Sequence, residues 1–328
     1  MTARFDLHRR LDDLPFFGLV AALYFGLVYP TWFSSYIGLT SVLLQFIFFT
    51  SGLRIDLRSI LTELRDIKLF AAVVFLRLLI FPIVVYFLSH SFFPSLTLPL
   101  VLLAAMPAGM TSPLFVEMVR GNVPLALLLT AGTSLFSVIS LPIVLGFLGG
   151  EEMLFDPWSM FRTLLFTMAM PLAMAQVIRI STFGQALITK GRLLSRISSI
   201  LALWLLVATI VAKNSGAIQD QFEGNGALVS TCIISGLFII FHVICYALGF
   251  WRSRRDRLTV TLSLSYMNFT LAIFLAETLF RDPGAMFVVI LSILPWNIGL
   301  IIFQWLVRRN GWMINEGIGE KEKPAFAG

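Results

Sequence analysis

The sequence predicts an all-α membrane protein of ten transmembrane helices, arranged as two five-helix repeats of opposite orientation. Three observations lead to this prediction. Of the 328 residues, 58% are hydrophobic and 13% are charged, whereas a soluble domain carries about a quarter charged residues. Apolar stretches recur at lengths that cross a hydrocarbon core of about 30 Å. Basic residues gather on alternate connections between these stretches.

Ten apolar spans divide the chain into halves of five. In the first half, residues 14–148, the expected spans are 14–32, 37–53, 69–88, 96–119 and 123–148. In the second half, residues 160–307, they are 160–180, 197–212, 227–250, 258–280 and 285–307. We expect a retained cytoplasmic N-terminus over 1–13, an interfacial helix over 55–67, an external linker over 149–159 and a disordered cytoplasmic tail over 308–328.

The distribution of basic residues predicts the orientation. With the connections assigned alternately to two sides, twenty Lys and Arg residues fall on one side, whereas Arg162, Lys213 and Arg281 fall on the other. Because basic loops are retained in the cytoplasm, both termini are expected there, in a multi-pass protein of the plasma membrane. These loops also account for the net charge of +6, so the lipid bilayer and not nucleic acid is the expected partner. The oligomeric state is open, with a monomer favoured.

The fourth span contains an expected helix break. Pro107 and Pro113 lack a backbone donor, and Gly109 between them permits non-helical dihedral angles. Non-helical backbone inside the membrane is tolerated only where it packs against protein or lines a water-filled cavity. The break therefore indicates a binding site. The half-helix that follows would start near Thr111 or Ser112 and present its amides to an anion. A simple kink in a packed helix is the alternative.

A resemblance to a known family becomes visible around this break. The chain reads Pro107-Ala108-Gly109-Met110-Thr111-Ser112 and then Arg120-Gly121-Asn122-Val123. In order and spacing these motifs resemble the bile acid:sodium symporter family. The resemblance implies a panel domain and a core domain, crossed discontinuous helices four and nine, and sodium-driven uptake of an organic anion.

The resemblance also identifies positions of the family's cation sites. Ser112 and Thr130 keep their hydroxyls at these positions. The remaining positions read Arg77, Pro113, Ala126, Ser263 and Met267. Loss of most oxygen ligands and gain of a fixed positive charge argue against Na⁺ coupling, and we expect no other cofactor or metal.

Arg77 stands out among the intramembrane residues. It lies nine residues after Lys68, which places it ~13 Å into the core of the membrane. We hypothesise that its guanidinium takes the place of a coupling cation and attracts an anionic substrate. The expected substrate-binding residues, several of them from the resemblance, are Arg77, Met110, Thr111, Ser112, Asn268, Trp296 and Asn297. Their Met, Trp and Asn mixture favours a small, partly apolar organic anion.

The predicted function is therefore secondary transport of a small organic anion by alternating access. A sodium-independent facilitator or exchanger, a proton-coupled carrier and a non-transporting membrane sensor are the alternatives. For proton coupling Glu117 and Glu277 are candidates, although their spacing to Arg120 and Arg281 favours ion pairs. An enzyme is not expected, because no hydrolase, zinc-protease or phosphate-loop motif occurs in the sequence.

Overall fold

The computed structural model describes residues 18–56, 66–149, 156–222, 226–280 and 283–309. In this part of the chain the regular elements are helices, and one isolated β-bridge pairs two segments that lie between helices. Seven helices are long and apolar enough to cross a membrane: Ile37–Arg54, Ile67–Phe92, Val123–Leu148, Pro157–Ile180, Leu193–Lys213, Gly226–Leu248 and Gly284–Val307. Shorter apolar helices cover Gly18–Val28, Pro94–Ala105 and Phe269–Thr278. The all-helical membrane fold is confirmed, whereas the count of ten and the inverted repeat stay predictions.

Several predicted segments lie outside the described residues. They are the N-terminus over 1–13, most of the interfacial helix, most of the linker over 149–159, and the tail from 310 onward.

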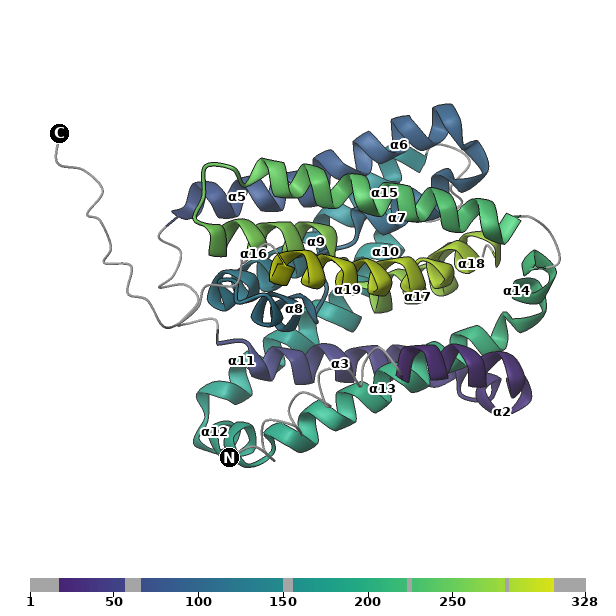
Figure 1. Ribbon diagram of the computed structural model, residues 1–328. Coiled ribbons are helices and arrows are strands. Elements are labelled where there is room, and N and C mark those ends of the chain that lie inside the picture. The colour runs from purple at the N-terminus through teal and green to yellow at the C-terminus, as the bar shows by residue number, and fades with distance from the viewer. Residues whose placement is uncertain (1–17, 57–65, 150–155, 223–225, 281–282, 310–328) are drawn as a thin grey trace.

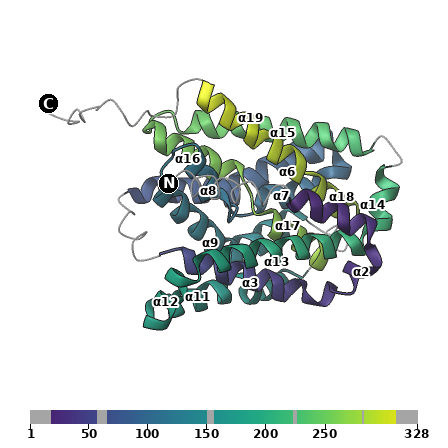
Figure 2. The same ribbon diagram turned by 60° about the horizontal axis from the view of Figure 1, so that its bottom comes forward.

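The helices form two layers (Figure 1). One layer contains α2 (Pro30–Ser34), α3 (Thr40–Arg54), α11 (Met170–Ile180), α12 (Thr182–Lys190) and α13 (Arg192–Lys213). In both views α3 and α13 run side by side, away from α15 (Gly226–Leu248) and α19 (Ile293–Arg309) of the other layer (Figure 2). That larger layer also holds α5 (Ile67–Phe75), α6 (Phe81–Phe92), α7 (Thr97–Ala105), α8 (Ser112–Met118), α16 (Arg254–Ser265), α17 (Phe269–Leu275) and α18 (Pro283–Leu291). α9 (Val123–Gly149) connects the layers by packing against α10 (Pro157–Leu164) as well as α8.

Two predicted spans are interrupted in the middle. The fourth span is split into α7 and α8, with the interruption at 106–111. Pro107 and Gly109 lie inside it, whereas Pro113 is in the first turn of α8, where a fixed φ suits a helix. The ninth span is split into α16 and α17 around Met267. No Gly or Pro marks this second break, so its cause must lie in tertiary structure.

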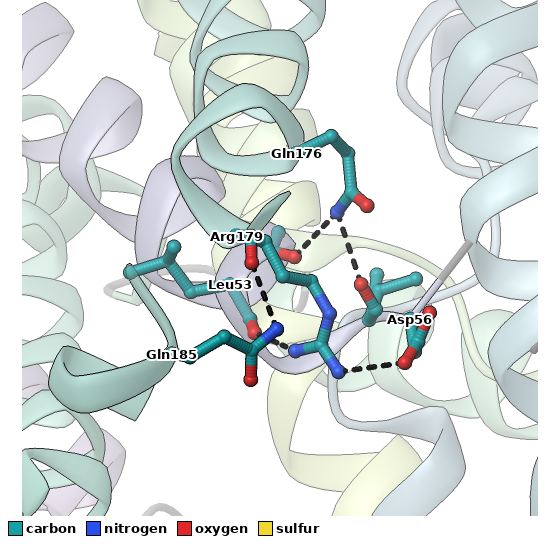
Figure 3. A network of polar contacts seen from close by, with 7 residues as sticks. Leu53, Asp56, Gln176, Arg179 and Gln185 are labelled. Atoms are coloured by element: carbon teal, nitrogen blue, oxygen red, sulfur yellow. Dashed lines mark hydrogen bonds and ion pairs between the residues drawn. The ribbon is translucent and has the colours of Figure 1, made fainter. Parts of the chain in front are cut away.

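A polar network fixes the end of α3 against α11 (Figure 3). Gln176 Nε2 donates to the carbonyls of Gly52 (2.7 Å) and Ile55 (3.0 Å). Arg179 donates to the Leu53 carbonyl (2.6 Å) and pairs with Asp56 (3.0 Å). These side chains satisfy the carbonyls that a helix end leaves without partners, so the last turn of α3 has a defined position.

The turn between α8 and α9 is built around Asn122. Arg120 has a left-handed backbone, with φ of 56°, and a Cβ on Gly121 would lie 2.8 Å from Thr259 Oγ1. Asn122 donates from Nδ2 to Asp256 (2.8 Å) and from its amide to Thr259 Oγ1 (2.7 Å). Its Oδ1 accepts from the Leu125 amide (3.2 Å) and so caps α9. This turn therefore anchors α9 to the first turns of α16.

We predict that Asn122→Ala lowers stability by about 1–2 kcal/mol, because it removes a helix cap and a bond to a carboxylate together. The measurement is thermal unfolding of the purified protein in detergent. An unchanged melting temperature would show that the turn does not anchor the two helices.

Candidate binding site at the helix crossover

The two interrupted helices cross, and their backbones pair at the crossing. The amide of Gly109 donates to the Tyr266 carbonyl and the amide of Asn268 donates to the Pro107 carbonyl, each at 2.9 Å. These bonds form the isolated antiparallel bridge between Ala108 and Met267. Each break thus supplies the hydrogen-bond partners that the other needs inside the membrane.

Gly109 allows the two backbones to approach. A Cβ at this position would lie 2.8 Å from the Met267 carbonyl oxygen, closer than such contacts allow. Two side chains hold the backbone near the crossing: Thr133 Oγ1 accepts from the Ala108 amide (3.1 Å), and Trp296 Nε1 donates to the Ser265 carbonyl (2.7 Å). The crossing is therefore a packed, hydrogen-bonded unit of the larger layer.

A cavity of about 350 Å³ lies between this crossing and the α3–α13 layer. Six of the predicted site residues line it: Met110, Thr111, Met267, Asn268, Trp296 and Asn297. Opposite them are apolar side chains of α3 and α13 and, at the end of α3, Ser51, Arg54 and Ser199. Arg77 and Ser112 are not among the lining residues. The cavity is thus largely apolar with polar groups at separate places, as in sites that bind small organic molecules.

Asn268 provides the best-placed polar group at the crossing. Its Oδ1 accepts from the Leu271 amide (3.0 Å) and caps α17, which orients the side-chain amide. Its Nδ2 is buried and has no hydrogen-bond partner among the described residues. By contrast, the Ser112 amide at the start of α8 already donates to the Gly109 carbonyl (2.9 Å).

Comparisons with known proteins agree with this geometry. A family model described as the SBF-like CPA transporter family matches residues 14–311. The chain belongs to this family. It is therefore a multi-pass membrane protein of a transporter family, and the predicted resemblance to bile acid:sodium symporters is confirmed.

Two relatives show how distant this member is. The chain is 24% identical over 220 residues to the "Uncharacterized protein YbaS" of Bacillus subtilis (strain 168), covering 66% of this chain and 68% of that protein. It is 25% identical over 187 residues to the "Probable sodium/metabolite cotransporter BASS3, chloroplastic" of Arabidopsis thaliana. That second alignment covers 53% of this chain but 41% of the plant protein.

Arg77 lies behind the crossing in this SBF-like protein, away from the cavity. It belongs to a π-helical turn, Leu76–Ile80, that contacts α7 and α9. Its side chain is 1% exposed, and its Nε and Nη2 have no hydrogen-bond partner in the described part of the chain. Burying a guanidinium with two of its three nitrogens unpartnered is expensive, and such π-helical turns often occur at functional sites.

Hydroxyl groups without partners are concentrated on the helices around the crossing. They belong to α8, α9 and α16, which contact one another. They are Ser112, Thr130, Ser134, Ser140, Ser263 and Ser265, each with a buried Oγ or Oγ1 that has no partner among the described residues. Three of them, Ser112, Thr130 and Ser263, stand at predicted cation-site positions.

These residues offer few ligands for a sodium ion. Pro113, Ala126 and Met267 have no side-chain oxygen, and no group of three or more His, Cys, Asp or Glu that could hold a metal exists among the described residues. The hydroxyls of Ser112, Thr130 and Ser263 are neutral, and Arg77 in the same layer carries a positive charge that opposes a cation nearby.

Two sets of important residues were missed by sequence reasoning. Thr133, which holds the crossing, is one of four hydroxyl residues spaced three or four apart in α9: Thr130, Thr133, Ser134 and Ser137. This helical spacing in an apolar span was the available signal. Arg54 lines the cavity, but in the sequence it was one of twenty basic residues that set the orientation.

We predict that Gly109→Ala lowers the unfolding free energy by about 1–3 kcal/mol, because the added methyl group would displace the Met267 carbonyl from the crossing. The matched control is Gly236→Ala, since a Cβ there meets nothing within 4 Å. Thermal unfolding in detergent measures both. Equal stability of the two variants would contradict the close approach.

Proposed function

We propose that this protein is a secondary transporter that carries a small, partly apolar organic anion across the plasma membrane by alternating access. The observation that carries the proposal is the cavity of about 350 Å³ between the two layers, which is largely apolar and is lined by residues of the helix crossing, Asn268 among them. Membership of a transporter family supports the same reading. The bias in basic residues supports cytoplasmic termini.

One end of the cavity reaches the surface. Arg54 is exposed and also lines the cavity, so the cavity is accessible from the end of α3. This end lies on the side that the basic residues predict to be cytoplasmic. The conformation is therefore best described as open toward the cytoplasm.

The opposite end is held together by ionic contacts between the layers. Lys213, the last residue of α13, pairs with Glu277, and the neighbouring Asn214 Nδ2 donates to the same carboxylate at 2.8 Å. Glu277 belongs to the π-helical turn after α17. Its expected partner Arg281 lies outside the described residues. The Lys213–Glu277 pair thus links the α3–α13 layer to the crossing, and we propose that it closes the outer side.

Arg77 bears on whether transport needs a sodium gradient. A fixed guanidinium behind the crossing would replace a mobile cation, so transport would not require a sodium gradient. The energetic cost of its burial supports a functional reason for its presence. The same charge would raise the affinity of the crossing region for anions through the low-dielectric protein.

The test is a binding screen followed by uptake. Purified protein is tested by thermal shift with monocarboxylates from butyrate to octanoate and with 3-phenylpropionate, each with and without Na⁺. A bound anion is expected to raise the melting temperature, and uptake into proteoliposomes is expected to be equal in sodium and choline buffers. Uptake that rises steeply with a sodium gradient would contradict the role of Arg77. Counterflow without any gradient would identify a facilitator or exchanger, and binding without uptake would identify a sensor.

We predict that Lys213→Gln opens the outer side. The reporter is Thr270→Cys on the cavity wall, labelled from outside by a membrane-impermeant maleimide, with Cys232 and Cys245 replaced by alanine. Removing an ion pair worth ~0.7 kcal/mol should increase the population of the state that is open to the outside, and with it the labelling rate, about threefold. Arg162→Gln is the control, because Arg162 is another cation on the same predicted side. An unchanged rate in Lys213→Gln would exclude this pair as the outer closure.

We predict that Arg77→Met reduces anion uptake about tenfold or more without lowering the melting temperature. Replacing a poorly compensated buried charge by an apolar side chain of similar length is usually neutral or stabilising. Uptake and melting temperature of the same preparation separate function from folding. Full uptake by the variant, or a steep loss of stability, would contradict the proposed role.

A further inference from the structure

Arg54 is the charged residue of the cavity. Among the described residues that line the cavity, it alone carries a formal charge. The other polar groups there are neutral amides, including the Asn268 side chain, and hydroxyls. The formal charge on the wall of the cavity itself is therefore that of this guanidinium, in addition to the buried charge of Arg77 behind the crossing.

The side chain of Arg54 continues the cavity-lining face of α3. Leu44, Ile47, Phe48 and Ser51 line the cavity from the same helix, and their spacing of three to four residues places them on one face with Arg54. Arg54 is seven residues beyond Ile47, or about 10 Å along the axis. An apolar wall therefore leads directly to a cationic end.

Two contacts orient the guanidinium across the layer. Arg54 Nη2 donates to Ser199 Oγ at 2.9 Å and to the Ser195 carbonyl at 3.1 Å. Ser199 is buried and also shares a hydrogen bond with Thr50 (2.7 Å). The group is thus preorganised by α13, which reduces the entropic cost of binding a ligand.

The backbone that carries Arg54 is fixed as well. In the network of Figure 3, Gln176 and Arg179 donate hydrogen bonds to the carbonyls of Gly52 and Leu53. These bonds keep the last turn of α3 from fraying. In the same network the nearby acid, Asp56, forms an ion pair with Arg179 at 3.0 Å. Asp56 thus belongs to the same network that holds this end of α3.

We infer that Arg54, oriented by Ser199, binds the anionic group of the transported substrate, whose apolar body lies along the apolar side chains of α3 and α13. This inference rests on the proposed function and narrows its substrate class to amphipathic organic monoanions with the charge at one end. Arginine suits this role because its planar fork matches a carboxylate. A role limited to membrane orientation or lipid headgroup contact is the competing interpretation.

The experiment compares each carboxylate of the panel with its neutral primary amide, for example 3-phenylpropionate with 3-phenylpropionamide. Affinities are measured by thermal shift in lipid-free detergent for wild type, Arg54→Gln, Arg54→Lys and the control Arg309→Gln. Arg309 lies near the same predicted side, over the ring of Trp305, and does not line the cavity. The acid-to-amide ratio is the readout, because a general loss of folding would weaken both ligands alike.

We expect wild type to prefer the acid about tenfold or more. The ratio should fall to about one in Arg54→Gln, recover partly in Arg54→Lys and stay at the wild-type value in Arg309→Gln. If Arg54→Gln keeps the preference, this inference is wrong while the proposed transport function stands. If wild type binds none of the carboxylates, the proposed substrate class itself fails.

Discussion

Two backbone hydrogen bonds at the helix crossing hold the structure on which the site depends. Each interrupted helix leaves amides and carbonyls without partners at membrane depth, where water cannot replace them. The bonds from Gly109 to Tyr266 and from Asn268 to Pro107 resolve this problem for both helices at once. They also place Met110, Thr111 and Asn268 on one wall of a cavity that a pair of continuous helices would not form.

The buried polar groups are divided between the two faces of this crossing. On the cavity face, Asn268 and the distant Arg54 can contact a ligand. On the other face, Arg77 and partnerless hydroxyls are enclosed by helices. A protein that retains an uncompensated guanidinium there loses stability, which is understandable if the charge replaces a cation that other transporters must bind. Substrate recognition and ion replacement would then be carried by two different arginines.

Much of this fold follows from the sequence, because apolar length and hydrophobicity determine where helices cross lipid. Pro107 and Gly109 marked the first break for a local reason, whereas the second break at Met267 has no local cause and arises from pairing with the first. Arg77 was predicted to face the cavity and attract the substrate, but the structure buries it behind the crossing and away from the cavity lining, which follows from helix packing that the sequence does not show. Arg54 was counted only as a topology residue, since nothing in the sequence shows that the last turn of α3 borders a cavity.

The central claim is that the cavity between the crossing and the α3–α13 layer binds the anion. The most direct measurement is a crystal structure with 3-(4-bromophenyl)propionate, in which anomalous scattering locates the bromine. We expect one bromine peak inside this cavity, with the carboxylate density at Arg54 and Ser199. A bound molecule whose bromine lies outside the cavity, or at the partnerless hydroxyls behind the crossing, would contradict it.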